Sequence, residues 1–223
     1  MKRWLQVGLG LVSVLLVILA AVLFLAQRAS QHVPAFYAEA LKADPARQRI
    51  AGERMTKAAA ALASDVQREG RWQAVFTEED LNAWLAVELV EKHGDLLAAA
   101  VSDPRVKIEP DNLTIAFRYR DGGRSVVVSL AIDAYLVEPS VVALRIRKAR
   151  AGALPLPLDN ILREVAKSTD QWEWQVDWRQ AGGDPVAQIT IPPLGARRNR
   201  QAQIETLRLE SGKIVLAGAT KRT

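Results

Sequence analysis

Residues 113–138 read LTIAFRYRDGGRSVVVSLAIDAYLVE, and this stretch decides the fold. Apolar side chains recur at every second position on both sides of Asp121-Gly122-Gly123. This alternation is typical of a β-strand buried on one face, and an Asp-Gly pair between two such runs is a strong hairpin signal. The stretch therefore predicts two antiparallel strands joined by a tight turn. Their inward-facing residues are Leu113, Ile115, Phe117 and Tyr119, then Val126, Val128, Leu130, Ile132, Ala134 and Leu136.

The same pattern continues in both directions from this hairpin. Upstream, Val106 and Ile108 alternate with charged residues and end at the turn Pro110-Asp111-Asn112. Downstream, after Glu138-Pro139-Ser140, the residues Val142, Leu144 and Ile146 alternate with Arg145 and Arg147. We therefore predict an antiparallel meander. Further strands are expected at 172–178 and 186–191, and a closing hairpin at 204–209 and 214–217.

Helices are predicted between and before these strands. Asp44-Pro45 is a helix start that continues to Gly70, as a stalk or as a helix resting on the domain. Thr77 is an N-cap for a helix ending near Gly94, and Pro157 opens another. The carboxylates of Glu78-Glu79-Asp80 suit the positive end of the helix dipole better than a metal ion.

The N-terminal segment from Trp4 to Gln27 carries no charge. As a helix it would span roughly 36 Å, enough to cross a ~30 Å hydrocarbon layer. A cleaved signal peptide is the alternative, but its apolar region is shorter, at ~7–15 residues. Lys2 and Arg3 precede the segment and favour a cytoplasmic N-terminus. We expect an anchor at 1–27, a juxtamembrane helical stalk at 28–70 and an extracytoplasmic antiparallel-sheet domain at 71–223.

Composition excludes several kinds of chemistry. The 223 residues contain no cysteine, so disulfides, thiol nucleophiles and thiolate metal sites are ruled out. The two histidines, His32 and His93, lie in no ligand or nucleophile motif, and no phosphate-loop, dinucleotide, zinc-protease or serine-hydrolase motif is present. We therefore predict a protein that is not an enzyme and has no metal or cofactor. The net charge of +5 selects no partner by itself.

Two groups of residues are candidate binding sites. Trp172, Trp174 and Trp178 share one strand face, which forms either ordinary core or an apolar groove for an acyl chain. Arg197, Arg198 and Arg200 are candidate contacts for anionic lipid headgroups. Basic charge also gathers in one strand, at Arg145, Arg147, Lys148 and Arg150, of which Arg145 and Arg147 are expected on the solvent face. An extracytoplasmic location argues against nucleic acid as a partner.

Three short motifs carry a family resemblance: FTEEDLNAWL at 76–85, GALPLP at 152–157 and LESGKI at 209–214. With the order of elements across 72–218, they resemble the YpmS-like membrane-anchored bacterial proteins and, more loosely, the LmeA-like envelope proteins. The resemblance implies a curved antiparallel sheet around a helix, similar to the tubular lipid-binding (TULIP, BPI-like) domains. It also implies an apolar groove between helix and sheet, and it brings no catalytic residues.

The sequence thus predicts an α+β protein with an N-terminal transmembrane helix, a meander sheet and one or two packed helices. The expected function is membrane-tethered lipid binding or lipid handling in a bacterial envelope. The alternative is a structural or scaffolding domain that binds an envelope protein. The predicted groove residues are Trp84, Leu85, Leu130, Ile132, Trp172, Trp174 and Trp178.

Overall fold

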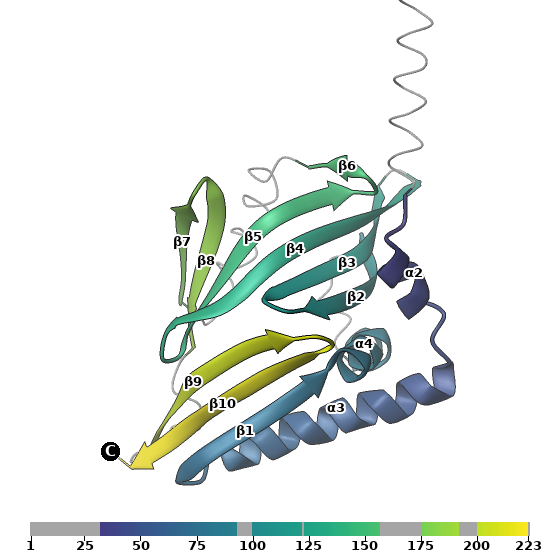
Figure 1. Cartoon of the computed structure of the whole chain (residues 1–223). Helices are drawn as coiled ribbons and strands as arrows, with labels where there is room; N and C mark the ends of the chain where they lie inside the picture. The colour runs from purple at the N-terminus through teal and green to yellow at the C-terminus, as the bar shows by residue number, and fades with distance from the viewer. Residues whose placement is uncertain (1–31, 93–99, 122, 157–174, 192–199, 223) are drawn as a thin grey trace, which may run out of the picture.

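The strands form two curved antiparallel sheets, flanked by a few helices, so the fold class is α+β (Figure 1). The computed structural model describes residues 32–92, 100–121, 123–156, 175–191 and 200–222. The large sheet has the strand order β2-β3-β4-β5-β8-β7, with β6 paired to β5, and the small sheet has the order β1-β10-β9. The sequence predicted one sheet, and the division into two is the main difference.

The meander predicted from the sequence is confirmed. It consists of β2 (Val101–Glu109), β3 (Asn112–Asp121), β4 (Arg124–Glu138) and β5 (Val141–Ala151). Asp111 and Ser140 adopt positive φ angles of 60° and 63° at the turns after β2 and β4, where the chain must reverse within a few residues. The large sheet continues through β8 (Asp184–Thr190) and β7 (Gln175–Ala181), and β6 is Leu154–Pro155.

The small sheet joins strands that are far apart in the sequence. β1 (Gly70–Thr77) pairs with β10 (Lys213–Arg222) along its whole length, from Gly70 opposite Thr220 to Thr77 opposite Lys213. β9 (Arg200–Glu210) forms the predicted closing hairpin with β10. A Cβ on Gly218 would overlap the Trp72 ring and the Gln203 carbonyl, so the close approach of these strands requires glycine there.

The two predicted helix starts that fall within the described residues are confirmed by their caps. α3 (Pro45–Asp65) begins after Asp44, whose Oδ1 accepts hydrogen bonds from the N–H groups of Ala46 at 2.7 Å and Arg47 at 3.3 Å. α4 (Glu78–Ala86) begins after Thr77, whose Oγ1 accepts from the Asp80 N–H at 3.1 Å. The helix expected to reach Gly94 divides at Val87, and α5 (Glu88–Lys92) follows. A short helix, α2 (Ala35–Ala40), precedes α3.

α3 packs against α4 and the small sheet, and a helix resting on the domain is one of the two arrangements that the sequence left open. Its Arg54 forms ion pairs with Asp80 at 2.7 Å and with Glu79 at 3.2 Å on α4. Close to its C-terminal end, the buried Thr220 hydroxyl donates to the Val66 carbonyl at 2.8 Å and accepts from Trp72 Nε1 at 3.2 Å. The region 28–70, expected as a stalk, is therefore part of the folded body from α2 onward.

α4 closes the free edge of β2 with side chains. The Asn82 amide donates to the Val106 carbonyl and accepts from the Val106 N–H, both at 2.8 Å. One turn earlier, the Glu78 carboxylate accepts from the Ile108 N–H at 2.7 Å, while the Ile108 carbonyl accepts from Gly212 of the small sheet at 3.0 Å. Because these bonds replace a missing neighbour strand, β2 does not present an open edge at these residues.

Three predicted features lie outside the described residues: the anchor at 1–27, the helix opened by Pro157, and the strand positions Trp172 and Trp174. Within the described ranges, no helix is both long enough and apolar enough to span a membrane.

Candidate functional site

One face of the large sheet is apolar across five strands, and we call it the apolar face. The register places Ile115, Leu130 and Ala149 in one row across β3, β4 and β5. Another row runs from Ala134 on β4 through Leu144 and Ala187 to Trp178 on β7. Paired residues of antiparallel strands point to the same side, so these rows form one continuous surface.

The apolar face is only partly covered. Ile132 and Ile146 are buried, with 8% and 6% of their surface exposed. Leu130, Leu144 and Trp178 on the same face are half-buried. The Trp178 Nε1 atom is buried and has no hydrogen-bond partner among the described residues. A packed core normally buries such side chains fully, so this face retains accessible apolar surface.

The structure brings together three of the seven predicted groove residues. Leu130, Ile132 and Trp178 lie on the apolar face. Trp84 and Leu85 are half-buried on α4, which packs at the β2 edge of the sheet, while Trp178 lies on β7 at the other edge. Trp172 and Trp174 lie outside the described residues. The sequence pattern thus predicted which residues share the apolar face, but it did not predict where α4 lies relative to that face.

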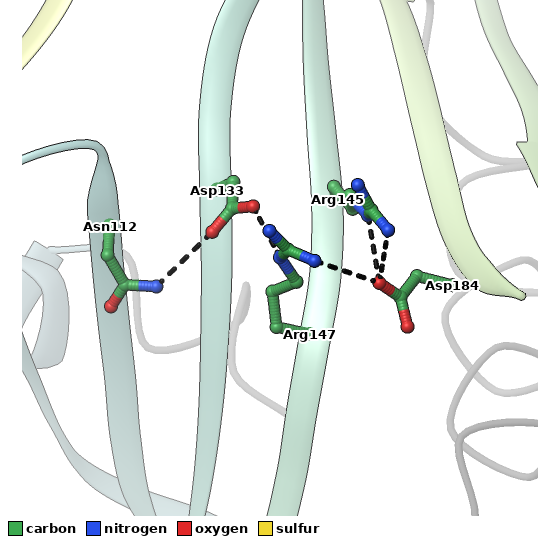
Figure 2. A network of polar contacts seen from close by, with 5 residues as sticks. All are labelled: Asn112, Asp133, Arg145, Arg147 and Asp184. Carbon is green, nitrogen blue, oxygen red and sulfur yellow. Dashed lines mark hydrogen bonds and ion pairs between the residues drawn. The ribbon is translucent and has the colours of Figure 1, made fainter. Parts of the chain in front are cut away.

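The opposite face of the large sheet carries an ion-pair network, which Figure 2 shows from close by. Arg147 Nε donates to Asp133 at 2.6 Å and its Nη1 donates to Asp184 at 3.4 Å. Arg145 contacts the same Asp184 oxygen through Nη2 at 2.6 Å and Nε at 2.8 Å. Asn112 donates to Asp133 at 3.5 Å. The network ties β3, β4 and β5 to the β7–β8 hairpin, and these arginines occupy the polar face as predicted.

A polar cleft of about 580 Å³ lies where the α2–α3 connection meets α3, α4 and β2. Lys42 and Arg47 line it and form no ion pair with the described residues. Glu78 and Lys107 also line it, but they pair with each other at 3.2 Å. None of the five predicted groove residues that the structure describes borders this cleft.

The acidic cluster at the start of α4 has structural partners. Glu78 bonds Lys107 and the Ile108 N–H, and Glu79 and Asp80 bond Arg54. Among the described residues, no group of three carboxylate or histidine side chains has a geometry that could hold a metal ion. This cluster therefore orients α4 against β2 and α3.

A buried polar cluster lies under α2. Tyr37 is completely buried against Ala116 and Val127, and its hydroxyl has no hydrogen-bond partner among the described residues. Burial, followed by the nearby Asp103 carboxylate, raises the pKa of the Tyr37 phenol above its usual 10.0. Burial likewise lowers the pKa of Arg105, whose Nη1 donates to the Pro104 carbonyl at 2.7 Å. Sequence reasoning did not find this cluster, because Arg105 follows the alternation of an outward-facing strand residue.

Arg200, the one predicted headgroup contact that the structure describes, bonds within the fold. Its Nη1 donates to the Gln67 carbonyl at 2.6 Å, and its Nε lies 3.9 Å from Glu69. It pairs in register with Arg222 at the end of the small sheet, where β1 begins. Arg197 and Arg198 lie outside the described residues.

Comparison of the chain with protein-family models, with curated proteins and with solved structures found no match in any of the three. The resemblance to the YpmS-like and LmeA-like proteins therefore stays a prediction.

Proposed function

We propose that this chain is a membrane-tethered domain of the bacterial envelope that holds a lipid acyl chain against the apolar face. The N-terminal segment would anchor it with the N-terminus in the cytoplasm and the domain outside. The observation that carries the proposal is the half-buried state of Leu130, Leu144 and Trp178 on a surface that is otherwise apolar. We assign no reaction and no cofactor to this surface.

The dimensions of the apolar face suit an acyl chain. β4 has 15 residues and, at ~3.3 Å per residue, spans roughly 50 Å. Half of a ~30 Å bilayer core, the depth that one acyl chain fills, is ~15 Å. The row of β4 side chains on this face is therefore longer than such a chain needs. The sequence resemblance implies a curved, tubular lipid-binding architecture, and we propose that architecture together with the function.

The two faces of the large sheet differ in a way that also supports lipid binding. On the opposite face, Arg145 and Arg147 are paired with Asp133 and Asp184, so these four charges need no further partner. The apolar face gains free energy from any apolar occupant, at ~25 cal/mol per Å² removed from water. An acyl chain, which requires no hydrogen bonds, meets that condition.

The second candidate is a scaffolding domain that binds an envelope protein. The cleft favours it, because about 580 Å³ of open space is lined by charges of both signs, including Lys42 and Arg47 and the carboxylates of Glu39 and Asp44. A partner segment that carries both acidic and basic side chains would match this lining. In this case the apolar face is an internal surface without a lipid.

Photo-crosslinking separates the two candidates. The full chain, reconstituted with a phospholipid that carries a diazirine in its acyl chain, is irradiated and digested. Crosslinks are expected on β3, β4 and β5 peptides in addition to the N-terminal segment. Leu130→Gln should reduce the sheet crosslinks severalfold, whereas Ser129→Gln, the neighbour facing the other side, should not. Crosslinks confined to the N-terminal segment would exclude acyl-chain binding by the sheet.

A further inference from the structure

Three basic side chains without ion-pair partners lie at one end of the charged side of the large sheet. Arg120 is the partner of Ser125 across β3 and β4, Arg150 is the partner of Ser129, and Lys148 is the partner of Ala131 across β4 and β5. All three are exposed, and none has a hydrogen bond or ion pair with the described residues. We call Arg120, Lys148 and Arg150 the basic end.

The basic end differs from the arginines further along the same face. Arg145 and Arg147 are neutralised by Asp133 and Asp184, and Arg118 lies 3.4 Å from Asp103. The charges of the basic end have no such partner in the part of the chain that the structure describes. Unpaired charges on one side of one end of a domain form a site for an anionic surface. The adjoining helix α2 has one acidic residue, Glu39, which is exposed.

The chain enters the described fold at this same end. Tyr37 of α2 packs between Ala116 and Val127, and Ala116 occupies the same row of the sheet as Ser129 and Arg150. Figure 1 shows α2 beside the end of the sheet where β3 and β4 are joined, while the C-terminus lies at the far end of the small sheet. α2 therefore packs against β2, β3 and β4 on the charged side of the sheet, close to the rows that hold Arg120 and Arg150.

The distance from the predicted anchor is short. Residues 28–34 separate Gln27 from the start of α2 at Ala35, and these residues extend to at most roughly 25 Å. The end of the sheet that carries Arg120, Lys148 and Arg150 is thus the part of the large sheet nearest to the membrane in a tethered chain. Arg200, by contrast, lies at the opposite end of the fold, next to the start of β1.

We propose that Arg120, Lys148 and Arg150 bind the phosphate groups of anionic phospholipids and so hold the sheet against the membrane surface. The inference rests on the tether in the proposed function and adds the orientation of the domain. Electrostatic contact decays over ~8 Å at physiological ionic strength, so the basic end must approach the headgroups closely. Each basic residue near an anionic surface raises the equilibrium constant for surface binding about fivefold.

The test uses the full chain in nanodiscs of phosphatidylcholine alone or mixed with phosphatidylglycerol. The chain has no native cysteine, so Ser125→Cys gives a single labelling site beside Arg120. A fluorophore at this site should be quenched by headgroup spin-labelled lipid in discs with phosphatidylglycerol, and much less in phosphatidylcholine alone. Adding Lys148→Glu and Arg150→Glu should lower the occupancy of the surface-bound state by roughly tenfold or more.

The matched control is the pair Arg71→Glu and Lys221→Glu, which changes the charge equally at the far end of the small sheet. It should leave the quenching at position 125 unchanged. Quenching that is independent of phosphatidylglycerol, or stronger at a fluorophore on Gln201→Cys at the far end, overturns the inference. Charge reversal should leave acyl-chain crosslinking of the sheet unchanged. The loss of headgroup binding at the basic end can therefore be distinguished from a failure of acyl-chain binding at the apolar face. A chain that does not enter nanodiscs at all refutes the tether and this orientation with it.

Discussion

The side chain of Asn82 forms two hydrogen bonds of 2.8 Å with the backbone of Val106, donating to its carbonyl and accepting from its N–H. An amide side chain thereby occupies the place of a neighbouring strand. Val106 is buried, so water does not easily replace either bond. The asparagine of the FTEEDLNAWL motif is therefore explained by the geometry of a helix packed against a sheet edge.

Replacing Asn82 by Ala should lower the free energy of unfolding by roughly 2–4 kcal/mol, because two buried backbone groups lose their partners. Denaturation of the full chain in urea measures the loss. Asn112→Ala is the control, since that amide donates to Asp133 at 3.5 Å and should cost less than about 1 kcal/mol. Equal losses in the two variants would contradict this role of Asn82.

Gly218 and Gly52 should respond to alanine in opposite directions. Gly218→Ala places a methyl group against the Trp72 ring and the Gln203 carbonyl, and should destabilise the fold by about 3 kcal/mol. Gly52 lies inside α3, where a new Cβ would be 3.6 Å from the Ala83 carbonyl oxygen. Gly52→Ala should therefore gain about 0.5–1 kcal/mol from helix propensity. Thermal denaturation of both variants checks the prediction, and a gain from Gly218→Ala would refute the packing described here.

The coupling energy of Asp184 with Arg145 should be larger than its coupling energy with Arg147. A double-mutant cycle of Asp184→Asn with Arg145→Met should give about 1 kcal/mol, because Arg145 bonds that carboxylate at 2.6 and 2.8 Å and both side chains are 24% exposed. The cycle with Arg147→Met, at 3.4 Å, should give less. Both values should fall at high salt. Glu53→Gln, which removes an exposed pair with Lys57, serves as the control and should cost about 0.3 kcal/mol.

Tyr37 should make stability depend on pH only in the alkaline range. Its folded-state pKa is raised above 10.0, so the folded protein holds this proton more tightly than the unfolded chain does. The contribution of Tyr37 to the free energy of unfolding is constant below about pH 10 and is lost as the pH rises through the folded-state pKa. The free-energy difference between the native chain and Tyr37→Phe, measured by urea denaturation between neutral pH and pH 11, should therefore change only above pH 10.

Two variants of Tyr37 separate the stability that comes from packing of its ring from the stability that comes from its hydroxyl. Below pH 10, Tyr37→Phe should be neutral or slightly stabilising, because the buried hydroxyl has no partner among the described residues. Tyr37→Ala should cost about 3–5 kcal/mol, the usual loss for a large buried aromatic side chain. A large loss in the Phe variant would show that the hydroxyl bonds a group outside the described residues.

Local features of the fold were predictable from the sequence because local chemistry determines them. Alternation along 113–138 predicted β3 and β4, and Asp44 and Thr77 predicted two helix starts. The pairing of β1 with β10 was not predictable, because the short, mixed sequence of β1 does not specify a partner so far away. The sequence pattern therefore predicted one sheet where the structure has two.

The candidate site was predictable only in part, for a related reason. Alternation correctly placed Leu130, Ile132 and Trp178 on one face, since side-chain direction in a strand has a period of two. It could not show that α4 binds the edge of β2, because that contact depends on side chains meeting backbone groups of a distant strand. Nor could it show that Lys148 lies on the same side as Arg145, because a register shift between Ala131 and Ile132 interrupts the alternation there. The acid that pairs with Arg145 also comes from another strand and could not be predicted.

The pairing of β1 with β10 has a consequence for the order of events during synthesis. Trp72 and Thr220 form a buried hydrogen bond although 148 residues separate them. At ~5–20 residues per second, the ribosome finishes β10 roughly 7–30 s after β1. Throughout that interval the apolar side of β1, including Trp72 and Phe76, has no partner strand. The small sheet is thus the last part of the described fold that can close, and the nascent chain is most exposed to misassociation and to proteases just before its final strand is made.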